Sequence, residues 1–187
     1  MIKIFPSHVA VLVPSVRKTS EYLRQFGFQI GKEEEWDGEG TREIYVERDK
    51  ANSLLLMEPI KPGAYQRAIE KRGPGLHHLA INVSDLDIYL ESLTGTGWLL
   101  HPKSIKTMKQ VRTAYLARPG FPALIEVQER KEILDHPLFV NEILIPIAPT
   151  LSNLITHIGL DGIVKSSSLN TMLSLDGQTI KLNDLFS

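Results

Sequence analysis

The sequence contains two copies of one pattern at a constant spacing. The first copy begins with residues 8–13, HVAVLV, and the second with residues 78–83, HLAINV, so the two opening histidines lie 70 residues apart. The same spacing continues without a gap and aligns Val16 with Leu86, Leu23 with Leu93, Gly27 with Gly97, Phe28 with Trp98, Arg42 with Arg112, Tyr45 with Tyr115 and Arg48 with Arg118. A register that keeps a histidine, a glycine, two arginines and a tyrosine is hard to obtain by chance. We therefore expect two similar units that share one core.

Each copy has the residue pattern of a βαβββ unit. In the first copy, an apolar strand over residues 9–13 is followed by a helix that Ser15 can cap and Gly27 can end. In the second copy, Asp85 can cap a helix over residues 86–94. The other predicted strands lie near residues 29–35, 41–47 and 53–58 in the first copy, and near residue 99 and at 111–117 and 123–128 in the second. The pattern predicts an α+β fold in which two tandem βαβββ modules form one cupped mixed sheet.

The predicted boundaries follow from this pattern. They are a first module at 1–60, a linker at 61–75 with a short helix at 64–72, a second module at 76–130 and an extension at 131–187. The extension resembles a partial third module, with strands at 141–147, 163–167, 170–175 and 179–182 and a helix at 150–158. Its last two strands are joined by Asp176-Gly177, which is typical of hairpins. We expect the extension to cover a sheet edge or to form a subunit contact.

Composition argues against several classes of function. The formal net charge is −1, so no broad field attracts nucleic acid or an anionic membrane. The chain has no cysteine, which excludes disulfides, thiolate metal sites and a cysteine nucleophile. Its apolar runs are too short for a membrane span or a signal peptide. We expect a cytoplasmic homodimer whose partner is a small-molecule substrate.

Three residues are candidates for a metal site. His8 and His78 hold the same position at the start of the first strand of each copy, and Glu126 stands in the otherwise apolar last strand of the second copy. When two βαβββ units curl together, these strands face one another across the sheet. Two imidazoles and one carboxylate suit Fe(II), Mn(II) or similar ions and leave positions open for substrate. The alternative is that each histidine is a buried, hydrogen-bonded core residue.

The neighbours of these residues limit the site. At the spacing of 70, Glu126 aligns with Leu56, so the first copy offers no equivalent ligand. Glu58 can serve as a fourth ligand if a bulge shifts its strand, and is otherwise a surface residue. Because His77 adjoins His78 in a strand, its side chain is expected on the opposite face.

Other polar residues are candidates for substrate contacts. Arg42 and Arg112 can clamp an acidic substrate, and Tyr45 and Tyr115 can line the cavity. The alternative is that these repeated residues are structural. Glu43 breaks the symmetry of the repeat, because its counterpart is a threonine. A carboxylate there can act as general base next to a carbonyl; the alternative is an exposed strand residue.

Two segments resemble methylmalonyl-CoA epimerases. Residues 69–83, IEKRGPGLHHLAINV, are similar to the linker and second opening strand of that family, and residues 8–14, HVAVLVP, are similar to its first strand. The resemblance covers residues 5–130. It identifies the chain as a member of the vicinal-oxygen-chelate group, also called the glyoxalase, bleomycin-resistance and dioxygenase superfamily.

The resemblance implies a site and a chemistry. It implies a divalent ion (Fe, Mn, Co, Zn or Ni) on His8, His78 and Glu126, and a substrate that chelates this ion. Glu43 falls where some epimerases have a catalytic carboxylate, so Glu43 and Glu126 are the implied catalytic residues. Epimerases and glyoxalases also have a glutamate or glutamine ligand in the last strand of their first unit. This chain has Leu55 there by the epimerase pattern and Leu56 by the internal repeat.

Three functions remain open. The first is a lyase or isomerase that moves a proton next to the carbonyl of a small oxo or acyl substrate, as an epimerase does. The second is an Fe(II) extradiol-type dioxygenase, since those enzymes use three ligands in the order His, His, Glu. The third is a resistance-type protein that binds a small molecule without catalysis. Because a pure binder has no need of a ligand set, the intact triad argues against the third.

Overall fold

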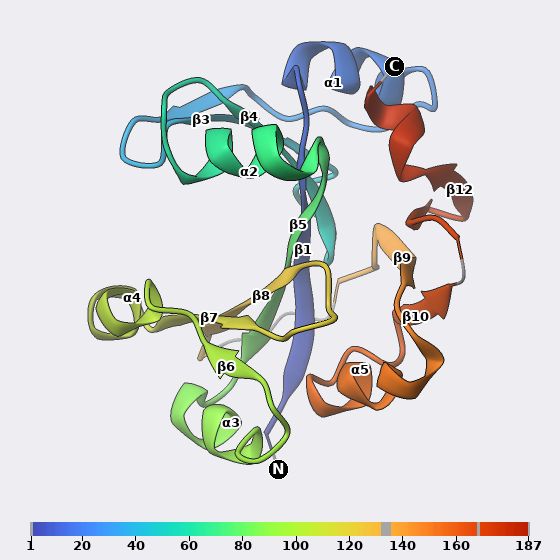
Figure 1. Cartoon of the computed structure of the whole chain (residues 1–187). Helices are drawn as coiled ribbons and strands as arrows, with labels where there is room; N and C mark the ends of the chain where they lie inside the picture. Colours follow the sequence, from blue (N-terminus) through green and yellow to red (C-terminus); the bar gives the residue numbers. More distant parts are fainter. Residues whose placement is uncertain (1, 132–135, 168, 187) are drawn as a thin grey trace.

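The computed structural model describes residues 2–131, 136–167 and 169–186. Its main feature is a curved eight-stranded mixed sheet in the order β2-β3-β4-β1-β5-β8-β7-β6 (Figure 1). Each half of the sheet is one βαβββ module, and the modules meet where β1 and β5 pair antiparallel. The predicted α+β fold with two tandem modules and a cupped sheet is confirmed. Residues 132–135, near the start of the predicted extension, lie outside the described part.

The elements have the following bounds. The first module consists of β1 (Ile4–Leu12), α1 (Val16–Arg24), β2 (Glu34–Trp36), β3 (Thr41–Val46) and β4 (Ser53–Pro59), and the linker contains α2 (Ala64–Arg72). The second module consists of β5 (Gly75–Val83), α3 (Leu86–Ser92), β6 (Leu99–Leu100), α4 (Ser104–Val111), β7 (Thr113–Ala117) and β8 (Leu124–Glu129). The extension consists of β9 (Val140–Pro146), η1 (Pro149–Leu151), α5 (Asn153–His157), β10 (Val164–Ser167), β11 (Met172–Leu175), β12 (Gln178–Lys181) and η2 (Leu182–Phe186). None of the helices in the described residues is long and apolar enough to cross a membrane.

The residues that were predicted to begin and end the module helices do so in the structure. The Ser15 hydroxyl accepts from the Lys18 amide at the start of α1, and the Asp85 carboxylate accepts from the Ile88 amide at the start of α3. Each side chain satisfies an amide that lacks a partner within its helix. Gly27 follows α1 with φ +83°, a conformation that favours glycine. The repeat therefore begins each module with the same strand and capped helix.

Two elements of the sheet edges differ from the prediction. In the first module β2 is only three residues long, and in the second the helix α4 precedes β7. The buried Ser104 holds α4 against β7, because its hydroxyl accepts from the Tyr115 amide and donates to the Tyr115 carbonyl. Arg112 follows α4 with φ +49°, so β7 begins at Thr113 rather than at Val111. The spacing of apolar residues did not predict that α4 lies beside β7, because the Ser104 hydroxyl, and not a neighbouring strand, bonds the backbone of Tyr115.

The strand registers show a pseudo-two-fold relation between the modules. On β1 and β5, His8 pairs with Ala80, and Ala10 pairs with His78. On the next parallel strands, Ala10 pairs with Leu55 and Ala80 pairs with Glu126. The counterpart of Glu126 is therefore Leu55, 71 residues earlier. The alignment with Leu56 at the spacing of 70 is corrected, because Val46 pairs with Leu54 whereas its counterpart Leu116 pairs with Ile125, so the second hairpin has one more residue between these paired positions.

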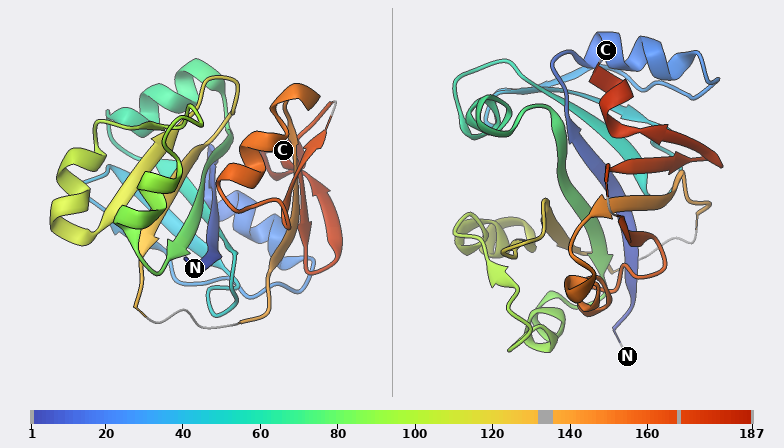
Figure 2. Two further views of the ribbon diagram at one scale, coloured as in Figure 1. Left: turned by 90° about the horizontal axis from the view of Figure 1, so that it is seen from below. Right: turned by 45° about the vertical axis from the view of Figure 1, so that its right-hand side comes forward.

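The two faces of the sheet have different coverings. Helices α2 and α4 lie over the concave face, whereas α1, α3 and the extension lie over the convex face (Figures 1 and 2). The main core fills the convex side and extends into the extension, where Phe139 is fully buried and packs edge-on against Phe28. On the concave side, only a small cluster around Ala10 and Leu55 is buried under Tyr65 of α2. The concave face therefore keeps room for polar side chains.

The extension docks onto both modules. Thr19 of α1 donates to the Leu185 carbonyl, and Tyr89 of α3 donates to the Ile158 carbonyl. The edges of the large sheet are β2 and β6, and the strands of the extension pair with neither, so the first expectation, cover for a sheet edge, is wrong; the alternative, a subunit contact, stays a prediction. The extension follows the order β-α-β-β-β, but its sheet order is β10-β9-β11-β12. Because β9 pairs in parallel with β10 rather than with the last strand, it is not a third copy of the module.

The repeated arginines have a structural role at the start of each module helix. Glu58 accepts from the Val16 amide of α1 at 2.9 Å and from Arg42 at 3.3 Å. In the same way, Glu129 accepts from the Leu86 amide of α3 at 2.9 Å and from Arg112 at 2.7 Å. Each arginine thus holds a carboxylate at the positive end of a helix. This contact explains why the arginines recur in the sequence.

We predict that Glu58→Ala destabilises the protein by about 1–2 kcal/mol, because the Val16 amide and Arg42 each lose an acceptor. The matched control is Glu21→Ala on the exposed side of α1, with an expected change within about 0.5 kcal/mol. Urea unfolding curves measure both. Equal midpoints for the two variants would show that the carboxylate at the helix start contributes nothing.

Candidate metal centre

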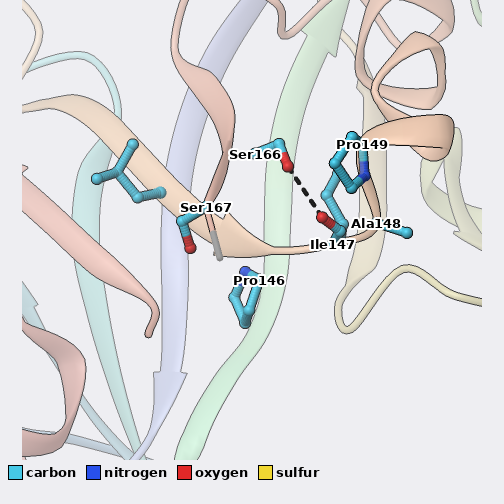
Figure 3. A pocket seen from close by; sticks show the side chains of 7 residues that line it. Pro146, Ile147, Ala148, Pro149, Ser166 and Ser167 are labelled. Atoms are coloured by element: carbon cyan, nitrogen blue, oxygen red, sulfur yellow. Dashed lines mark hydrogen bonds between the residues drawn. The ribbon is translucent and has the colours of Figure 1, made fainter. Parts of the chain in front are cut away.

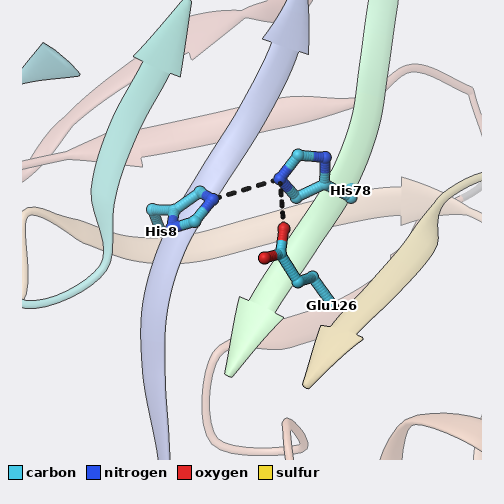
Figure 4. Close-up of side chains that lie close together, drawn as sticks. All are labelled: His8, His78 and Glu126. Atoms are coloured by element: carbon cyan, nitrogen blue, oxygen red, sulfur yellow. Dashed lines mark hydrogen bonds and ion pairs between the residues drawn. The ribbon is translucent and has the colours of Figure 1, made fainter. Parts of the chain in front are cut away.

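Three side chains converge on the concave face of the sheet. His8 comes from β1, His78 from β5 and Glu126 from β8 (Figure 4). The Nε2 atoms of His8 and His78 lie 3.1 Å apart, and the His78 Nε2 lies 3.2 Å from a Glu126 carboxylate oxygen. One ligand atom from each residue lies within 4.8 Å of the others. All three are buried, so the three candidate ligands of the sequence come together.

Burial determines the charge state of these groups. Burial lowers the pKa of His8 to about 4 and holds the pKa of His78 well below its ordinary value, with a further contribution from the neighbouring His8. Both imidazoles are therefore neutral at neutral pH. The contact between His78 and Glu126 is accordingly a close polar contact with a neutral imidazole and not an ion pair. Burial also raises the pKa of Glu126, because a buried carboxylate lacks the stabilisation that water gives.

The donor set fits a divalent transition-metal ion. Two neutral imidazoles and a carboxylate supply two nitrogen ligands and one oxygen ligand on adjacent strands. Ligands at about 2.1 Å from an octahedral ion lie about 3 Å apart when they are neighbours, which agrees with the two short distances. A bound cation would also compensate the buried charge of Glu126. These residues therefore fit a metal ion, and among the described residues three protein ligands would hold it.

No fourth ligand comes from the first module. Leu55 and Met57 of β4 line the concave face opposite Glu126. Glu58 points to the convex side, where it caps α1, so it does not serve as a fourth ligand. The geometry leaves the remaining positions of an ion free for substrate.

Each candidate ligand histidine is preceded by a bulged residue. The register of β1 and β5 skips Ser7 on one strand and His77 on the other, so each of these residues forms a β-bulge. The Ser7 hydroxyl lies 3.4 Å from the His8 Nδ1, and the His77 Nδ1 lies 2.8 Å from the His78 Nδ1. Both side chains therefore contact the ring nitrogen that faces away from the other ligands. Such contacts orient a ligand histidine and fix its tautomer.

The orientation of the His77 side chain differs from the sequence prediction. Strict alternation along a strand puts its side chain on the face opposite His78. The bulge instead turns its ring beside His78 and against Tyr65 of α2, with ring centroids 5.0 Å apart. A pair of adjacent histidines carries no sequence signal for a bulge, so the sequence did not reveal this contact.

The three ligands open into a cavity of about 180 Å³, which we call the central cavity. Beside the ligands, its lining includes Glu43, Tyr45, Leu55, Met57, Tyr65 and Tyr115. Burial raises the pKa of Glu43, although a hydrogen bond from Thr41 opposes the shift. Burial also raises the pKa of Tyr45 to about 12, so this residue keeps its proton. The structure thus brings Glu43, Tyr45 and Tyr115 to the candidate ligands.

The repeated arginines do not reach the central cavity. Arg42 contacts Glu33, Glu35 and Glu58, and Arg112 contacts Asp87 and Glu129. Neither residue lines the cavity around the ligands. Of the sequence-predicted substrate contacts, only the two tyrosines lie at the site.

A residue pair that sequence reasoning missed closes the opposite side of the central cavity. Glu39, in the turn between β2 and β3, accepts hydrogen bonds from Tyr65 of α2 and Lys103 beside α4. These contacts join both modules over the concave face. Neither Glu39 nor Lys103 belongs to the repeat, so only the structure reveals that they meet.

A different hollow, of about 840 Å³, lies in the extension (Figure 3). Its lining is Leu144, Pro146, Ile147, Ala148, Pro149, Ser166 and Ser167, where the Ser166 hydroxyl donates to the Ile147 carbonyl. Within the described residues, this lining contains no titratable side chain. The hollow therefore offers no acid, base or metal ligand, in contrast to the central cavity.

Comparisons with solved structures agree with this fold. A hypothetical protein from Bacillus halodurans C-125 superposes with a TM-score of 0.56 at 20% identity, over 72% of this chain and 99% of that one. A methylmalonyl-CoA epimerase from Mycobacterium tuberculosis superposes with a TM-score of 0.54 at 27% identity, over 67% and 87%. A Streptomyces coelicolor methylmalonyl-CoA epimerase variant, in complex with 2-nitronate-propionyl-CoA, superposes with a TM-score of 0.52 at 20% identity, over 66% and 96%.

The sequence itself gives a family assignment. No curated protein matches the chain. A family profile described as the Glyoxalase/Bleomycin resistance protein/Dioxygenase superfamily matches residues 7–115, which contain both histidines. The match covers more than half of the chain and agrees with the paired modules. The chain therefore belongs to the glyoxalase, bleomycin-resistance and dioxygenase superfamily, the vicinal-oxygen-chelate group.

Proposed function

We propose that this protein is a metal-dependent lyase or isomerase that moves a proton next to the carbonyl of a small oxo or acyl substrate. The observation that carries the proposal is the position of Glu43, a buried carboxylate, in the same cavity as His8, His78 and Glu126. The superfamily contains epimerases, glyoxalases and dioxygenases, and the epimerases among the structural neighbours support the isomerase chemistry.

The residues divide into binding and proton-transfer groups. His8, His78 and Glu126 hold a divalent ion that, when bound, polarises a carbonyl and stabilises negative charge on its oxygen. Glu43 accepts a proton from the carbon beside that carbonyl. Thr41 donates to one Glu43 oxygen at 2.8 Å and so orients the carboxylate. Tyr45 keeps its proton and can donate a hydrogen bond within the cavity.

The side of the central cavity that lies under α2 and the start of α4 supports proton transfer by Glu43. Leu55 and Met57 form an apolar wall, and Glu39 ties α2 to the start of α4 above it. A carboxylate in such surroundings is a stronger base than one in water, because burial raises its pKa. The bulged residues Ser7 and His77 keep the two ligand imidazoles in place.

One observation favours an Fe(II) dioxygenase of the extradiol type as the second candidate. Leu55 occupies the place of a fourth ligand, so the site has the three ligands that leave positions for substrate and oxygen. In that case Glu43 has no necessary role as a base. The two candidates therefore differ in the predicted effect of a substitution at this residue.

The first test separates metal binding from proton transfer. We expect protein purified without chelator to contain close to one divalent ion per chain, and Glu126→Gln to lose it. On a panel of 2-oxo acids and acyl thioesters in deuterium oxide, we expect Glu43→Gln to retain the ion and lose at least about a hundredfold of the exchange rate. Glu35→Gln is the matched control, because this exposed glutamate of β2 lies outside the cavity.

The outcomes decide between the candidates. Iron together with oxygen uptake on a catechol, unchanged in Glu43→Gln, would replace the proposal by the dioxygenase. Protein that binds no divalent ion, with ligand binding unaffected by His78→Ala, would leave only a non-catalytic binder.

The pH dependence of exchange gives a second prediction. Glu43 acts as a base only when it is deprotonated, and burial raises its pKa above 4.5. We therefore expect kcat/KM to rise with pH along an acid limb, and we expect Glu43→Gln to lose this limb. A limb that persists in Glu43→Gln would assign the base to another group.

His77 gives a third prediction, which concerns metal affinity. Because the His77 Nδ1 faces the His78 Nδ1 at 2.8 Å, we expect His77→Phe to weaken Co(II) binding about tenfold, and we expect His77→Asn, which keeps an acceptor, to restore part of it. The control is His157→Phe, a substitution of an exposed histidine in α5. Competition with a chromophoric chelator measures each dissociation constant. Equal constants for wild type and His77→Phe would exclude this positioning role.

A further inference from the structure

We propose that the substrate carries an anionic group, a carboxylate or a phosphate, which binds in a second cavity on the outer side of His8. This cavity, here called the basic cavity, has a volume of about 310 Å³. It shares His8, Tyr45 and Gln128 with the central cavity, so the two cavities adjoin at a candidate metal ligand. The inference rests on the proposed function, since it names the class of molecule that the same site takes.

The two cavities carry opposite charges. The basic cavity is lined by Arg48, Lys50 and Arg130, and none of its described lining residues is acidic. The central cavity instead contains Glu39 and Glu43 beside the ligand carboxylate. A substrate with chelating oxygens at one end and an anion at the other would match this separation. The three cationic side chains of the basic cavity would therefore stabilise the anionic end of the substrate.

Neighbouring groups hold these cations at the cavity without filling it. The Arg48 guanidinium lies 5.0 Å from the centre of the Tyr45 ring and contacts Glu34 through one nitrogen. Lys50 lies 3.2 Å from Asp176 of the extension and 3.5 Å from Glu47. None of these three carboxylates lines the basic cavity, and both cations line it. Because the side-chain exposure is 57% for Arg48 and 30% for Lys50, an entering anion can reach both.

Hydroxyl and amide groups complete the cavity on its inner side. Ser7 and Ser53 line it beside His8, and their hydroxyls can donate to an anion. Gln128 accepts from Arg130 through its oxygen and donates to the Glu126 carboxylate through its nitrogen at 2.6 Å. One amide therefore connects a cation of the basic cavity to a candidate metal ligand. An anion held here would lie next to the ion rather than on a separate surface.

The pseudo-two-fold relation shows that the cations Arg48 and Lys50 have no equivalent at the matching place in the second half. The counterpart of Arg48 is Arg118, which packs under Gly97 so closely that a Cβ on that glycine would lie 1.4 Å from the guanidinium. The counterpart of Lys50 is Gly120, which carries no charge. Both halves share the sheet and the histidine, but only the turn between β3 and β4 of the first half supplies two cations to the cavity; the third cation, Arg130, follows β8 of the second half. The difference is therefore one of site chemistry and not of fold.

The test uses chelator-treated protein, in which no metal ion competes for the anion. Inorganic phosphate and acetate are titrated separately by calorimetry. We expect at least one of the two to bind, and the stronger one identifies the substrate group as phosphate or carboxylate. We expect Arg48→Gln/Lys50→Gln to weaken this binding at least tenfold. The matched control is Lys18→Gln/Arg24→Gln, which removes the same two kinds of charge from the exposed side of α1.

Failure of either anion to bind wild-type protein, or equal loss in the control, would overturn the inference. Co(II) affinity, measured on the same variants, keeps this outcome apart from the proposed function. We expect Arg48→Gln/Lys50→Gln to retain Co(II) binding, because neither residue contacts a ligand. Anion binding without Co(II) binding would reject the metal enzyme and leave an anion-binding cavity. Co(II) binding without anion binding would support the metal centre and reject the anionic substrate.

Discussion

The antiparallel pairing of β1 with β5 is the contact on which the rest of the structure depends. Its register places His8 and His78 two positions apart across neighbouring strands, and both side chains point to the concave face. The parallel pairing of β5 with β8 then adds Glu126 beside them. A carboxylate buried next to two neutral imidazoles is costly, unless it is protonated or a cation binds. The sheet that joins the modules thus also creates a buried site that a bound cation would stabilise.

The sequence predicts the fold well, because a repeat with capped helices and alternating strands is a local pattern that tertiary contacts reinforce. It also predicts the ligands, since His8 and His78 are matched and Glu126 is out of place in an apolar strand. The remaining features depend on contacts that no local pattern carries. One extra residue in a turn changes the counterpart of Glu126 from Leu56 to Leu55. The bulge at His77 places its ring against that of His78, and two hydrogen bonds of Ser104 join the helix before β7 to Tyr115; neither contact has a local sequence signal.

Identity between the two halves wrongly indicated Arg42 and Arg112 as substrate contacts, because neither residue lines the central cavity. The matched Arg42 and Arg112 hold the carboxylates that cap helices on the convex side, whereas the cations at the concave face come from positions where the halves differ in conformation or residue. Three such differences meet around the ligands. Leu55 stands opposite Glu126, Glu43 has a threonine as its counterpart, and Arg48 faces a cavity while its counterpart is packed away. In this duplicated fold, the matched histidines and tyrosines lie at the site, the matched Arg42 and Arg112 maintain the scaffold, and the unequal residues make the two sides of the site different.

The most direct measurement of the central claim is anomalous diffraction from crystals soaked in Co(II). The account predicts one strong peak on the concave face, about 2.1 Å from the Nε2 atoms of His8 and His78 and from a carboxylate oxygen of Glu126. It also predicts that no side chain of β4 reaches the ion, because Leu55 and Met57 lie there. A peak at another place, or no peak at full cobalt saturation, would contradict the assignment of these three residues as a metal centre.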